Sequence, residues 1–331
     1  MDEATVSTGL TPDQVEQFAA DGYVKVEGLL DPTEDLDPVI DEYHGVLERL
    51  CVDLYKRGAI RETYAELSFS DRFIRVGTET NETNAQYFDF SLPQGDVTLD
   101  TPFWVGPAVF RTLTNTRLLE AAESIIGGEI YSNPVQHIRI KSPEKYEARD
   151  EVTGQLKMGA TNWHQDNGVL LPVADDSDIL TVWFSLTDAH EEHGCLRVVP
   201  GSHRLGLLDH CPAGPGGLEV PERISSRACA RALPTVRGDV IFLHKRTLHS
   251  SLPNVSDQIR WSFDLRYNPI GHETGRGAFP GFVARSRNEP GSELRDPAVW
   301  ANLWYQTRAQ LAGAKRNGPY HRWDANSTSC A

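Results

Sequence analysis

The sequence lacks the features of a secreted or membrane-spanning protein. Its first ten residues contain no basic segment followed by an apolar run, which a secretory signal requires. No stretch approaches the roughly 20 apolar residues that cross a bilayer. The five cysteines show no CxxC spacing typical of metal or redox sites. We therefore expect a cytoplasmic protein without a membrane partner, in which the cysteines are free thiols.

Positive charge is also scarce. Lys and Arg number 32 against 47 Asp and Glu, giving a formal net charge of −15. A surface this acidic repels phosphate backbones, so we expect no nucleic-acid partner. Glycine and proline, in contrast, are plentiful, with 27 and 20 residues. They indicate many turns, as in a strand-rich globular fold.

The chain opens with a capped helix followed by a strand. Residues 11–22 form the helix, in which Thr11 and Gln14 provide a capping box and Gly22 suits a left-handed stop. Residues 23–30 alternate apolar and polar side chains, which predicts a short strand.

Two further helices are expected before about residue 130. Apolar residues recur at helical spacing over 36–57 and over 106–126. Residues 60–100 between them are polar and weakly periodic, so we interpret them as a surface excursion.

After about residue 130 the sequence pattern changes to short runs of β-branched or aromatic residues separated by turn residues. The runs are VQHIRI, DILTVWFSL, CLRVVP, DVIFLH and IRWSFDLRY. Such spacing favours a mainly β fold with flanking α-helices, either a sandwich or a barrel. We expect one domain spanning 1–331, with a helical part at about 1–130, a β core at about 131–270 and an extension at about 271–331. Residues 204–238 form an irregular insertion, which suits a lid or a plain surface loop.

Three residues have the chemistry of a metal site. His164 and Asp166 are separated by one residue in the segment Trp163-His164-Gln165-Asp166, so on a strand they point to the same side. His249 lies downstream, just after the strand ending in VIFLH. Two histidines and one carboxylate form the facial triad of non-haem Fe(II) oxygenases. A His-x-Asp pair alone is weak evidence, because surface polar residues often show this spacing by chance.

A fourth residue adds a cation. Arg260 follows His249 by eleven positions, in QIRWSFDLRY. On an alternating strand Arg260 and Ser262 face one side, and Trp261 and Phe263 the other. A guanidinium group accepts a carboxylate bidentately, and the Ser262 hydroxyl adds a donor. This pair suits a dicarboxylic co-substrate bound to the metal at its other end, although a surface salt bridge is the alternative.

With these residues, the sequence resembles the phytanoyl-CoA dioxygenase family of Fe(II)/2-oxoglutarate-dependent oxygenases. Three blocks carry the resemblance. The first is LTPDQVEQFAADGYVKVEGLL. The second is WHQD followed by TVWFSLTDAHEEHGCLRVVPGSHR, and the third is GDVIFLHKRTLHSSLPNVSDQIRWSFDLRY. Their order and spacing match the family over most of the chain. The glycine, proline and serine of the PGSH turn, residues 200–203, are expected to set backbone geometry.

The resemblance implies a double-stranded β-helix (jelly-roll) core that binds Fe(II), 2-oxoglutarate and O2. His164, Asp166 and His249 match the metal ligands of the family. Arg260 matches the arginine that pairs with the far carboxylate of 2-oxoglutarate. Trp183 matches a tryptophan lining the co-substrate pocket, although it also suits a core position.

One contact to 2-oxoglutarate remains open. Family members often use a polar residue of the strand before the first ligand, here VQHIRIK. Gln136 is our choice, but His137, Arg139 and Lys141 alternate with it and could face the cavity instead. Arg139, Lys141 or Arg266 could also replace Arg260.

The expected reaction is hydroxylation of a C–H bond of a small metabolite in a biosynthetic pathway, releasing succinate and CO2. An acyl-CoA hydroxylase of the same family, a catalytically silent jelly-roll binding protein and a zinc hydrolase are the alternatives. Desaturation, cyclisation or demethylation are other outcomes of the same chemistry. We expect a monomer or homodimer. The candidate substrate contacts are residues 60–100, Asn167, Val169, residues 204–238, Trp300, Trp304 and Tyr305.

Overall fold

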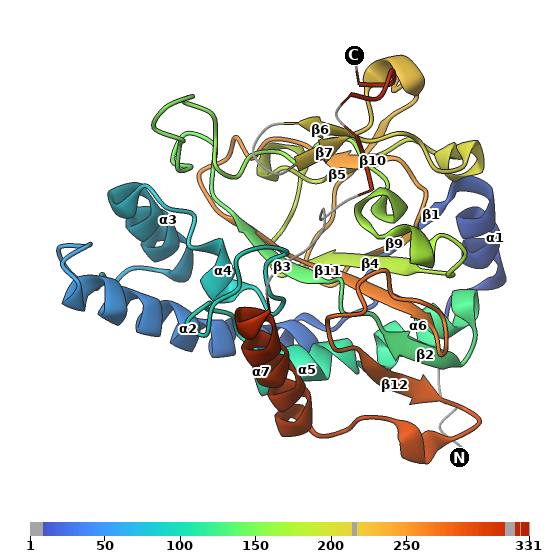
Figure 1. Ribbon diagram of the computed structural model, residues 1–331, viewed down its shortest axis with the longest axis horizontal. Coiled ribbons are helices and arrows are strands. Elements are labelled where there is room, and N and C mark those ends of the chain that lie inside the picture. The colour runs from blue at the N-terminus through green and yellow to red at the C-terminus, as the bar shows by residue number, and fades with distance from the viewer. Residues whose placement is uncertain (1–8, 214–216, 315–321, 325, 331) are drawn as a thin grey trace.

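Two antiparallel sheets form the centre of the protein (Figure 1). The computed structural model describes residues 9–213, 217–314, 322–324 and 326–330. The helices are α1 (Pro12–Asp21), α2 (Asp37–Lys56), α3 (Phe69–Thr80), α4 (Ala85–Phe88), α5 (Pro107–Leu113), α6 (Thr116–Ile126) and α7 (Pro297–Gly313). The strands are β1 (Tyr23–Val26), β2 (Glu129–Ser132), β3 (His137–Lys141), β4 (Leu180–Ser185), β5 (Leu196–Val198), β6 (Cys211–Ala213), β7 (Gly217–Glu219), β8 (Arg231–Leu233), β9 (Val240–His244), β10 (His249–Ser251), β11 (Arg260–Pro269) and β12 (Phe282–Ser286).

The large sheet has the strand order β1-β9-β4-β11-β2-β12, and β3 pairs with the first half of β11. The small sheet has the order β10-β5-β8, and β6 and β7 form a separate hairpin. Strands that are neighbours in the sheet, such as β4 and β9, are far apart in sequence. The chain therefore crosses repeatedly from one part of the structure to another. The expected mainly β architecture with flanking helices is confirmed.

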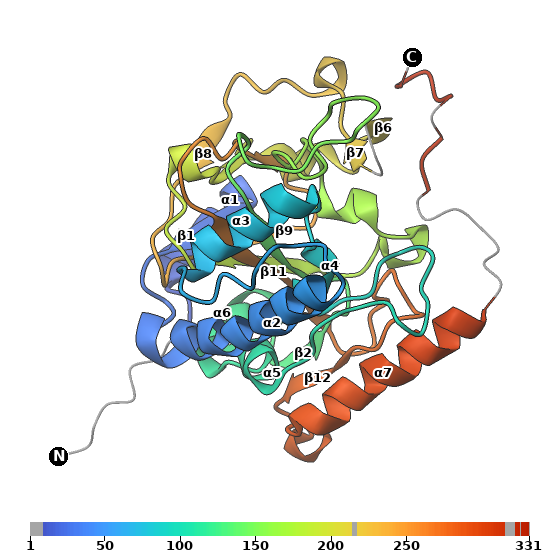
Figure 2. The same ribbon diagram turned by 90° about the vertical axis from the view of Figure 1, so that its left-hand side faces the viewer.

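Strand β11 separates two environments. Trp261 and Phe263 enter a large apolar core between the sheet and the helices, and Trp261 stacks on Phe69 of α3 at 4.6 Å between ring centres. Figure 2 shows α2, α5 and α7 on this same side of the sheet. Arg260 points to the opposite side, toward the small sheet. The predicted alternation along this strand is therefore confirmed.

The N-terminal helices follow the sequence signals, with one correction here and a second in residues 60–100. Helix α1 has the expected capping box between Thr11 and Gln14, and Gly22 ends it with φ +77°. The helix expected over 106–126 is two helices, because Asn115 accepts hydrogen bonds from the backbone of the following turn and starts α6.

Residues 60–100 are not merely a surface excursion. They contain α3, whose Phe69, Phe73 and Val76 are buried in the main core. The reason is visible in the sequence, since these residues recur at helical spacing and Ser68 caps the helix through Asp71 N. Polar residues on the exposed face obscured this period.

The C-terminal extension completes the fold. Strand β12 pairs with β2, and α7 buries Trp300 and Trp304 completely in the main core. The expectation that these two tryptophans contact substrate is therefore wrong. Residues 204–238 contain β6, β7 and β8, and β8 is a strand of the small sheet, so this segment is more regular than expected. Among the described residues no helix is both long and apolar enough to traverse a bilayer.

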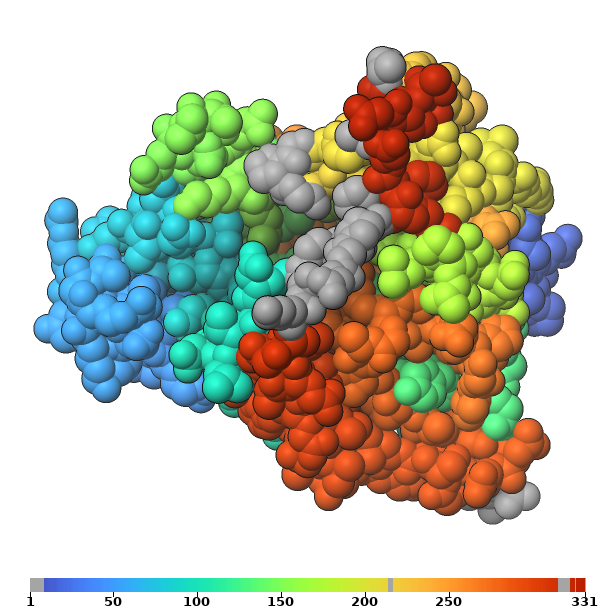
Figure 3. All heavy atoms as spheres, viewed as in Figure 1, coloured from blue at the N-terminus to red at the C-terminus, as the bar shows by residue number. Residues whose placement is uncertain are grey.

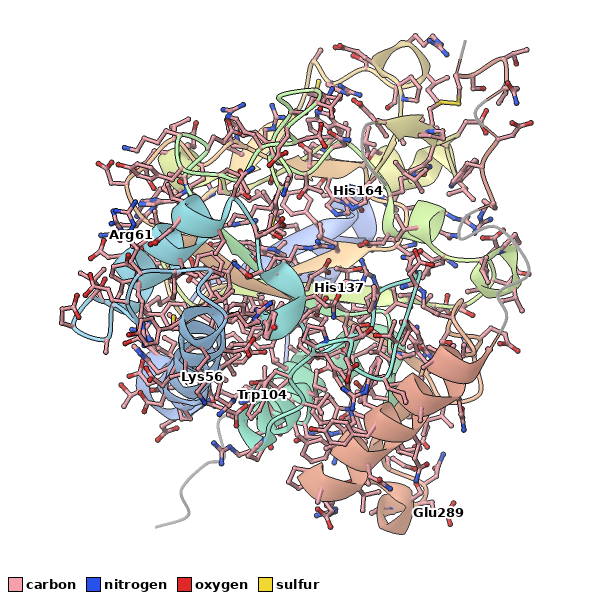
Figure 4. All side chains as sticks on the ribbon, turned by 60° about the vertical axis from the view of Figure 1, so that its left-hand side comes forward. Lys56, Arg61, Trp104, His137, His164 and Glu289 are labelled. Carbon is pink, nitrogen blue, oxygen red and sulfur yellow. A yellow bond between two sulfur atoms is a disulfide. The ribbon has the colours of Figure 1, made fainter. Side chains whose placement is uncertain are left out.

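A disulfide joins Cys211 of β6 to Cys330, the yellow bond near the upper right of Figure 4. The expectation that all cysteines are free is wrong for this pair, because two residues 119 positions apart in sequence meet with 5.4 Å between their Cα atoms. Sequence alone could not show this meeting. Cys51 and Cys195 are buried free thiols, and Cys229 is an exposed one.

Replacing Cys330 by Ser should lower the free energy of unfolding by about 2–5 kcal/mol, because the crosslink closes a long loop in the unfolded chain. Urea denaturation measures the change, and Cys229→Ser is the matched control that leaves the crosslink intact. Dithiothreitol should bring the wild type to the stability of the Cys330→Ser variant. Five titratable thiols in the denatured, unreduced wild type would contradict the bond.

Candidate functional site

His164 and His249 face each other at the edge of the small sheet. Each donates its backbone N–H to the carbonyl of the other, at 2.9 and 3.0 Å, and their ring centres are 4.2 Å apart. The Nδ1 atom of His164 lies 2.8 Å from Asn162 O, and that of His249 lies 2.9 Å from Thr247 O. Because a carbonyl only accepts, both Nδ1 atoms carry the proton, which leaves both Nε2 lone pairs free for a metal.

Asp166 completes a group of three ligand atoms. Its carboxylate oxygens lie 4.0 Å from His164 Nε2 and 4.0 Å from His249 Nε2, and the three ligand atoms lie within 4.8 Å of one another. Asp166 begins a short 3-10 turn rather than continuing a strand. Gln165 is nevertheless extended, so its neighbours still point to the same side. This donor set fits a divalent transition metal with open coordination positions.

Two residues of the large sheet hold the Asp166 carboxylate. Arg266 Nη2 donates to Oδ1, and Thr181 Oγ1 donates to Oδ2 at 2.6 Å. Arg266 and Thr181 are direct cross-strand partners on β11 and β4. Burial raises the pKa of Asp166, but Arg266, together with the neighbouring His249 and His164, outweighs burial and holds the pKa well below the usual range. Each oxygen keeps a second lone pair for a metal.

Sequence reasoning named Arg266 only as a substitute for Arg260. Its position on the inner face of β11 could have been predicted from its even spacing with Arg260, but its contact with Asp166 could not. No signal indicated that Thr181 would face the same carboxylate, since the pairing of β4 with β11 is not encoded locally.

The PGSH turn supports the His249 segment as expected. Ser202 Oγ accepts the backbone N–H of Leu248 at 2.9 Å, and Gly201 has φ +75°. His203 packs against the ring of His244 and lines neither cavity described below. The turn therefore positions the backbone beside a candidate ligand.

A small inner pocket lies beside the three ligand atoms. Its lining residues are Arg139, Thr161, His164, Thr181, Trp183, Leu196, Leu243, His249, Arg260 and Asp264. The Arg260 side chain is 2% exposed, yet it makes no hydrogen bond or ion pair with any described residue. Burial, followed by repulsion from Arg139, lowers the pKa of Arg260 to about 10. A buried guanidinium without a partner is costly, so this pocket is complementary to an anion.

Two other predicted residues flank Arg260. The Trp183 ring lines the inner pocket with its centre 5.7 Å from the Arg260 guanidinium carbon, and it also packs in the apolar core between the sheets. Both interpretations of Trp183 therefore agree with its position. Ser262 is buried on the inner face of β11, and its hydroxyl has no partner among the described residues.

A larger outer cavity of about 970 Å³ adjoins the inner pocket. Both share Arg139, Thr161, His164 and Asp264. Figure 4 shows His164 and His137, which also lines the outer cavity, toward the middle of the molecule. The remaining lining residues are Gln94, Gly95, Asp96, Val135, Lys141, Lys157, Met158, Gly159, Ala160, Asn162, Val169, Pro212, Gly217, Leu218, Arg266 and Arg276.

The choice of Gln136 finds no support in this geometry. Gln136 is 1% exposed, lines neither cavity and donates only to Ser132 Oγ, at 3.4 Å. Strand alternation places it with Ile138, which enters the main core, whereas Arg139 and Lys141 face the outer cavity. The alternation was recognised in the sequence, but which set faced inward depended on the pairing of β3 with β11.

The C-terminal residues pack over the turn that carries Asp166. Arg322 pairs with Asp175 and donates to the carbonyl of Leu170, while Trp323 stacks on His210. Figure 3 shows the described part of this segment, in red, on the surface beside the yellow β6–β7 region. His210 in turn accepts the N–H of Gln165 at 2.9 Å. Nothing in the sequence indicated these long-range contacts.

Comparisons with known proteins agree with this geometry. The profile of the phytanoyl-CoA dioxygenase (PhyH) family matches residues 18–262, and the chain belongs to this family. It is thus an Fe(II)- and 2-oxoglutarate-dependent dioxygenase that uses O2.

The individual relatives are distant. Phytanoyl-CoA dioxygenase domain-containing protein 1 of Bos taurus is 24% identical over 282 residues, covering 77% of this chain and 88% of the relative. L-proline trans-4-hydroxylase of Streptomyces griseoviridis is 25% identical over 192 residues, covering 52% of this chain and 67% of the relative. The solved structure of the non-heme monooxygenase ThoJ in its apo form has a TM-score of 0.53 at 20% identity, covering 91% and 98%. This likeness shows the fold, and the expected jelly-roll core is confirmed.

Replacing His164, Asp166 or His249 by Ala should abolish stoichiometric metal binding, because each variant loses one of three protein donors. Titration of the metal-free protein with Co(II), followed by absorption spectroscopy, measures this. His44→Ala, at an exposed position of α2, is the control and should bind as the wild type does. Full occupancy in any of the three variants would contradict the proposed ligand set.

The metal-free protein should lose stability as the pH falls from about 6.5 to about 4. Burial lowers the pKa of His210 to about 4, so the unfolded chain takes up its proton first and stability is complete only above the unfolded pKa. His210→Gln should reduce the slope of unfolding free energy against pH by up to about 1.4 kcal/mol per unit in this window. Urea denaturation at several pH values tests this, with His44→Gln as the control. An unchanged slope would contradict a neutral His210.

Proposed function

We propose that this chain hydroxylates a C–H bond of a small-molecule metabolite, with 2-oxoglutarate converted to succinate and CO2. His164, Asp166 and His249 hold the iron in this proposal, and Arg260 binds the far carboxylate of 2-oxoglutarate. The observation that carries it is the buried Arg260 guanidinium, which has no ionic partner among the described residues and lies in the same small pocket as His164 and His249. A zinc hydrolase has no need of such a cation.

The protein contributes orientation and a water-poor site. When bound, the iron supplies the oxidative chemistry. Arg266 and Thr181 fix the direction of the Asp166 carboxylate and balance its charge. Leu196 and Leu243 line the inner pocket, and apolar walls of this kind strengthen the attraction between Arg260 and a carboxylate.

The outer cavity supports a small-molecule substrate. Its volume of about 970 Å³ lies at the upper end of the range typical of small-ligand sites, roughly 300–1,000 Å³. It reaches His164 directly, so a substrate bound there lies beside the proposed iron position. The similarity to L-proline trans-4-hydroxylase supports hydroxylation of a small metabolite as the reaction.

Release of succinate that requires both Fe(II) and 2-oxoglutarate, and that increases with a metabolite from a screened library, tests the proposal. Mass spectrometry of the stimulating compound should show the addition of one oxygen atom. A chain that binds both cofactors but releases no succinate with any compound would favour a silent binding protein. A product that has lost two hydrogens would identify desaturation instead.

Arg260→Ala should raise the KM for 2-oxoglutarate, because the far carboxylate would be buried without its cation at a cost of roughly 2–5 kcal/mol. Metal affinity should change little, since the proposed ligands are untouched. Arg260→Lys should recover only part, because an ammonium lacks the planar fork. Titration of 2-oxoglutarate with iron occupancy measured in parallel gives the result.

Two controls sharpen this test. Pyruvate, a keto acid without the far carboxylate, should lose its disadvantage relative to 2-oxoglutarate in Arg260→Ala. Arg57→Ala removes an exposed guanidinium at the end of α2 and should leave the KM unchanged. If Arg260→Ala retains the wild-type KM, another cation of the inner face binds the carboxylate.

A further inference from the structure

Arg139 is a second cation without a partner. It lies in the middle of β3, and Ile138 and Ile140 on either side of it enter the main core. Its side chain is exposed to both the inner pocket and the outer cavity. It forms no hydrogen bond or ion pair with any other residue that the structure describes.

Three other cations of the outer cavity are already engaged. Lys141 Nζ donates to Gly159 O at 2.9 Å and to Thr161 Oγ1 at 2.7 Å. Lys157 pairs with Glu82, and Arg266 pairs with Asp166. Their hydrogen-bonding capacity is directed into the protein. Arg139 alone among these four presents an unengaged guanidinium to the cavity.

The local charge balance is opposite to that of the whole chain. Among the residues that the structure describes, five Lys and Arg residues and two acidic residues, Asp96 and Asp264, line the outer cavity, whereas the chain carries a formal net charge of −15. Asp264 pairs with Arg266 at 3.5 Å rather than with Arg139. Because Lys157 and Arg266 are already paired with Glu82 and Asp166, the guanidinium of Arg139 is a charge that can attract an anionic ligand to the cavity.

The proposed co-substrate does not account for Arg139. Its two carboxylates are assigned to the metal and to Arg260, and the charge of Asp166 is balanced by Arg266. Repulsion from Arg139 is one of the causes, after burial, that lower the pKa of Arg260. An anion bound near Arg139 would offset this repulsion.

We propose that Arg139 binds an oxyanion of the substrate, a carboxylate or a phosphate, and thereby holds an anionic small metabolite in the outer cavity next to His164. A guanidinium group binds either oxyanion through two parallel N–H donors, which fixes orientation as well as position. The rigid strand places this fork at the boundary between the two cavities. The inference rests on the proposed function, because it assigns 2-oxoglutarate to the inner pocket.

Binding to the Ni(II)-loaded protein with saturating 2-oxoglutarate tests this assignment without turnover. Filling the inner pocket first directs the probes to the outer cavity. The probes are a panel of small carboxylic acids, each paired with its methyl ester, and a panel of phosphate monoesters, each paired with its parent alcohol. Isothermal titration calorimetry gives each Kd for the wild type, Arg139→Gln, Arg139→Lys and the remote control Arg295→Gln, whose guanidinium is exposed and pairs with Glu293.

One or both anionic panels should contain ligands whose neutral partners do not bind. Arg139→Gln should weaken these ligands by about 10–100-fold, the effect of losing one charge-assisted contact. Arg139→Lys should retain part of the affinity, and Arg295→Gln should bind with wild-type Kd values. The Kd for 2-oxoglutarate should stay within about twofold in Arg139→Gln. The panel that supplies the ligands distinguishes a carboxylate from a phosphate.

Three results with the anion panels would overturn the assignment. They are equal binding of neutral and anionic partners, unchanged anion affinity in Arg139→Gln, and binding of 2-oxoglutarate with no anion from either panel. A loss of 2-oxoglutarate affinity in Arg139→Gln would instead assign this residue to the co-substrate, which also contradicts the proposal. Failure of the proposed function would look different. The titration of 2-oxoglutarate would then show no dependence on Arg260.

Discussion

Strand β11 must satisfy two incompatible environments at once. Its outer side chains, including Trp261 and Phe263, are buried among the helices, while Arg260 and Arg266 project between the sheets. A slip of one residue would exchange the two sets and bury guanidinium groups in an apolar core, at a prohibitive free-energy cost. The register of this strand against β3 and β4 is therefore strongly determined. The positions of all the proposed site residues on the large sheet depend on it.

The cations on the inner face differ in whether the protein itself neutralises them. Arg266 is paired with Asp166, so its charge helps to hold a side chain in one orientation. Arg260 and Arg139 have no such partner among the described residues. A buried charge without a partner, such as that of Arg260, is costly unless a ligand compensates it, whereas the exposed Arg139 faces the cavity. This distinction separates positioning residues from ligand-binding residues more reliably than residue type does, because all three are arginines of one sheet.

The sequence predicted those features that are local or that follow strand alternation. The capping box of α1, the two faces of β11 and the nearness of His164 to Asp166 are of this kind, whereas His249 was assigned from the chemistry of the facial triad and the family resemblance. The features that the sequence did not predict depend on contacts between segments that are far apart in the chain. The inward face of β3 is decided by the partner strand, and the Cys211–Cys330 bond by the path of the C-terminal segment. Helix α3 was missed for another reason, since its apolar period was present but diluted by an exposed polar face.

The three proposed ligands come from segments that meet only when both sheets have formed. His164 and His249 belong to the edge of the small sheet, while Asp166 is held by Arg266 and Thr181 of the large sheet. An ion held by all three would therefore link the two sheets. Because an unfolded chain offers no such arrangement, metal binding stabilises the folded state by an amount that grows with the logarithm of metal concentration. The same pairing that orients Asp166 for the ion thus couples the site to the closure of the fold.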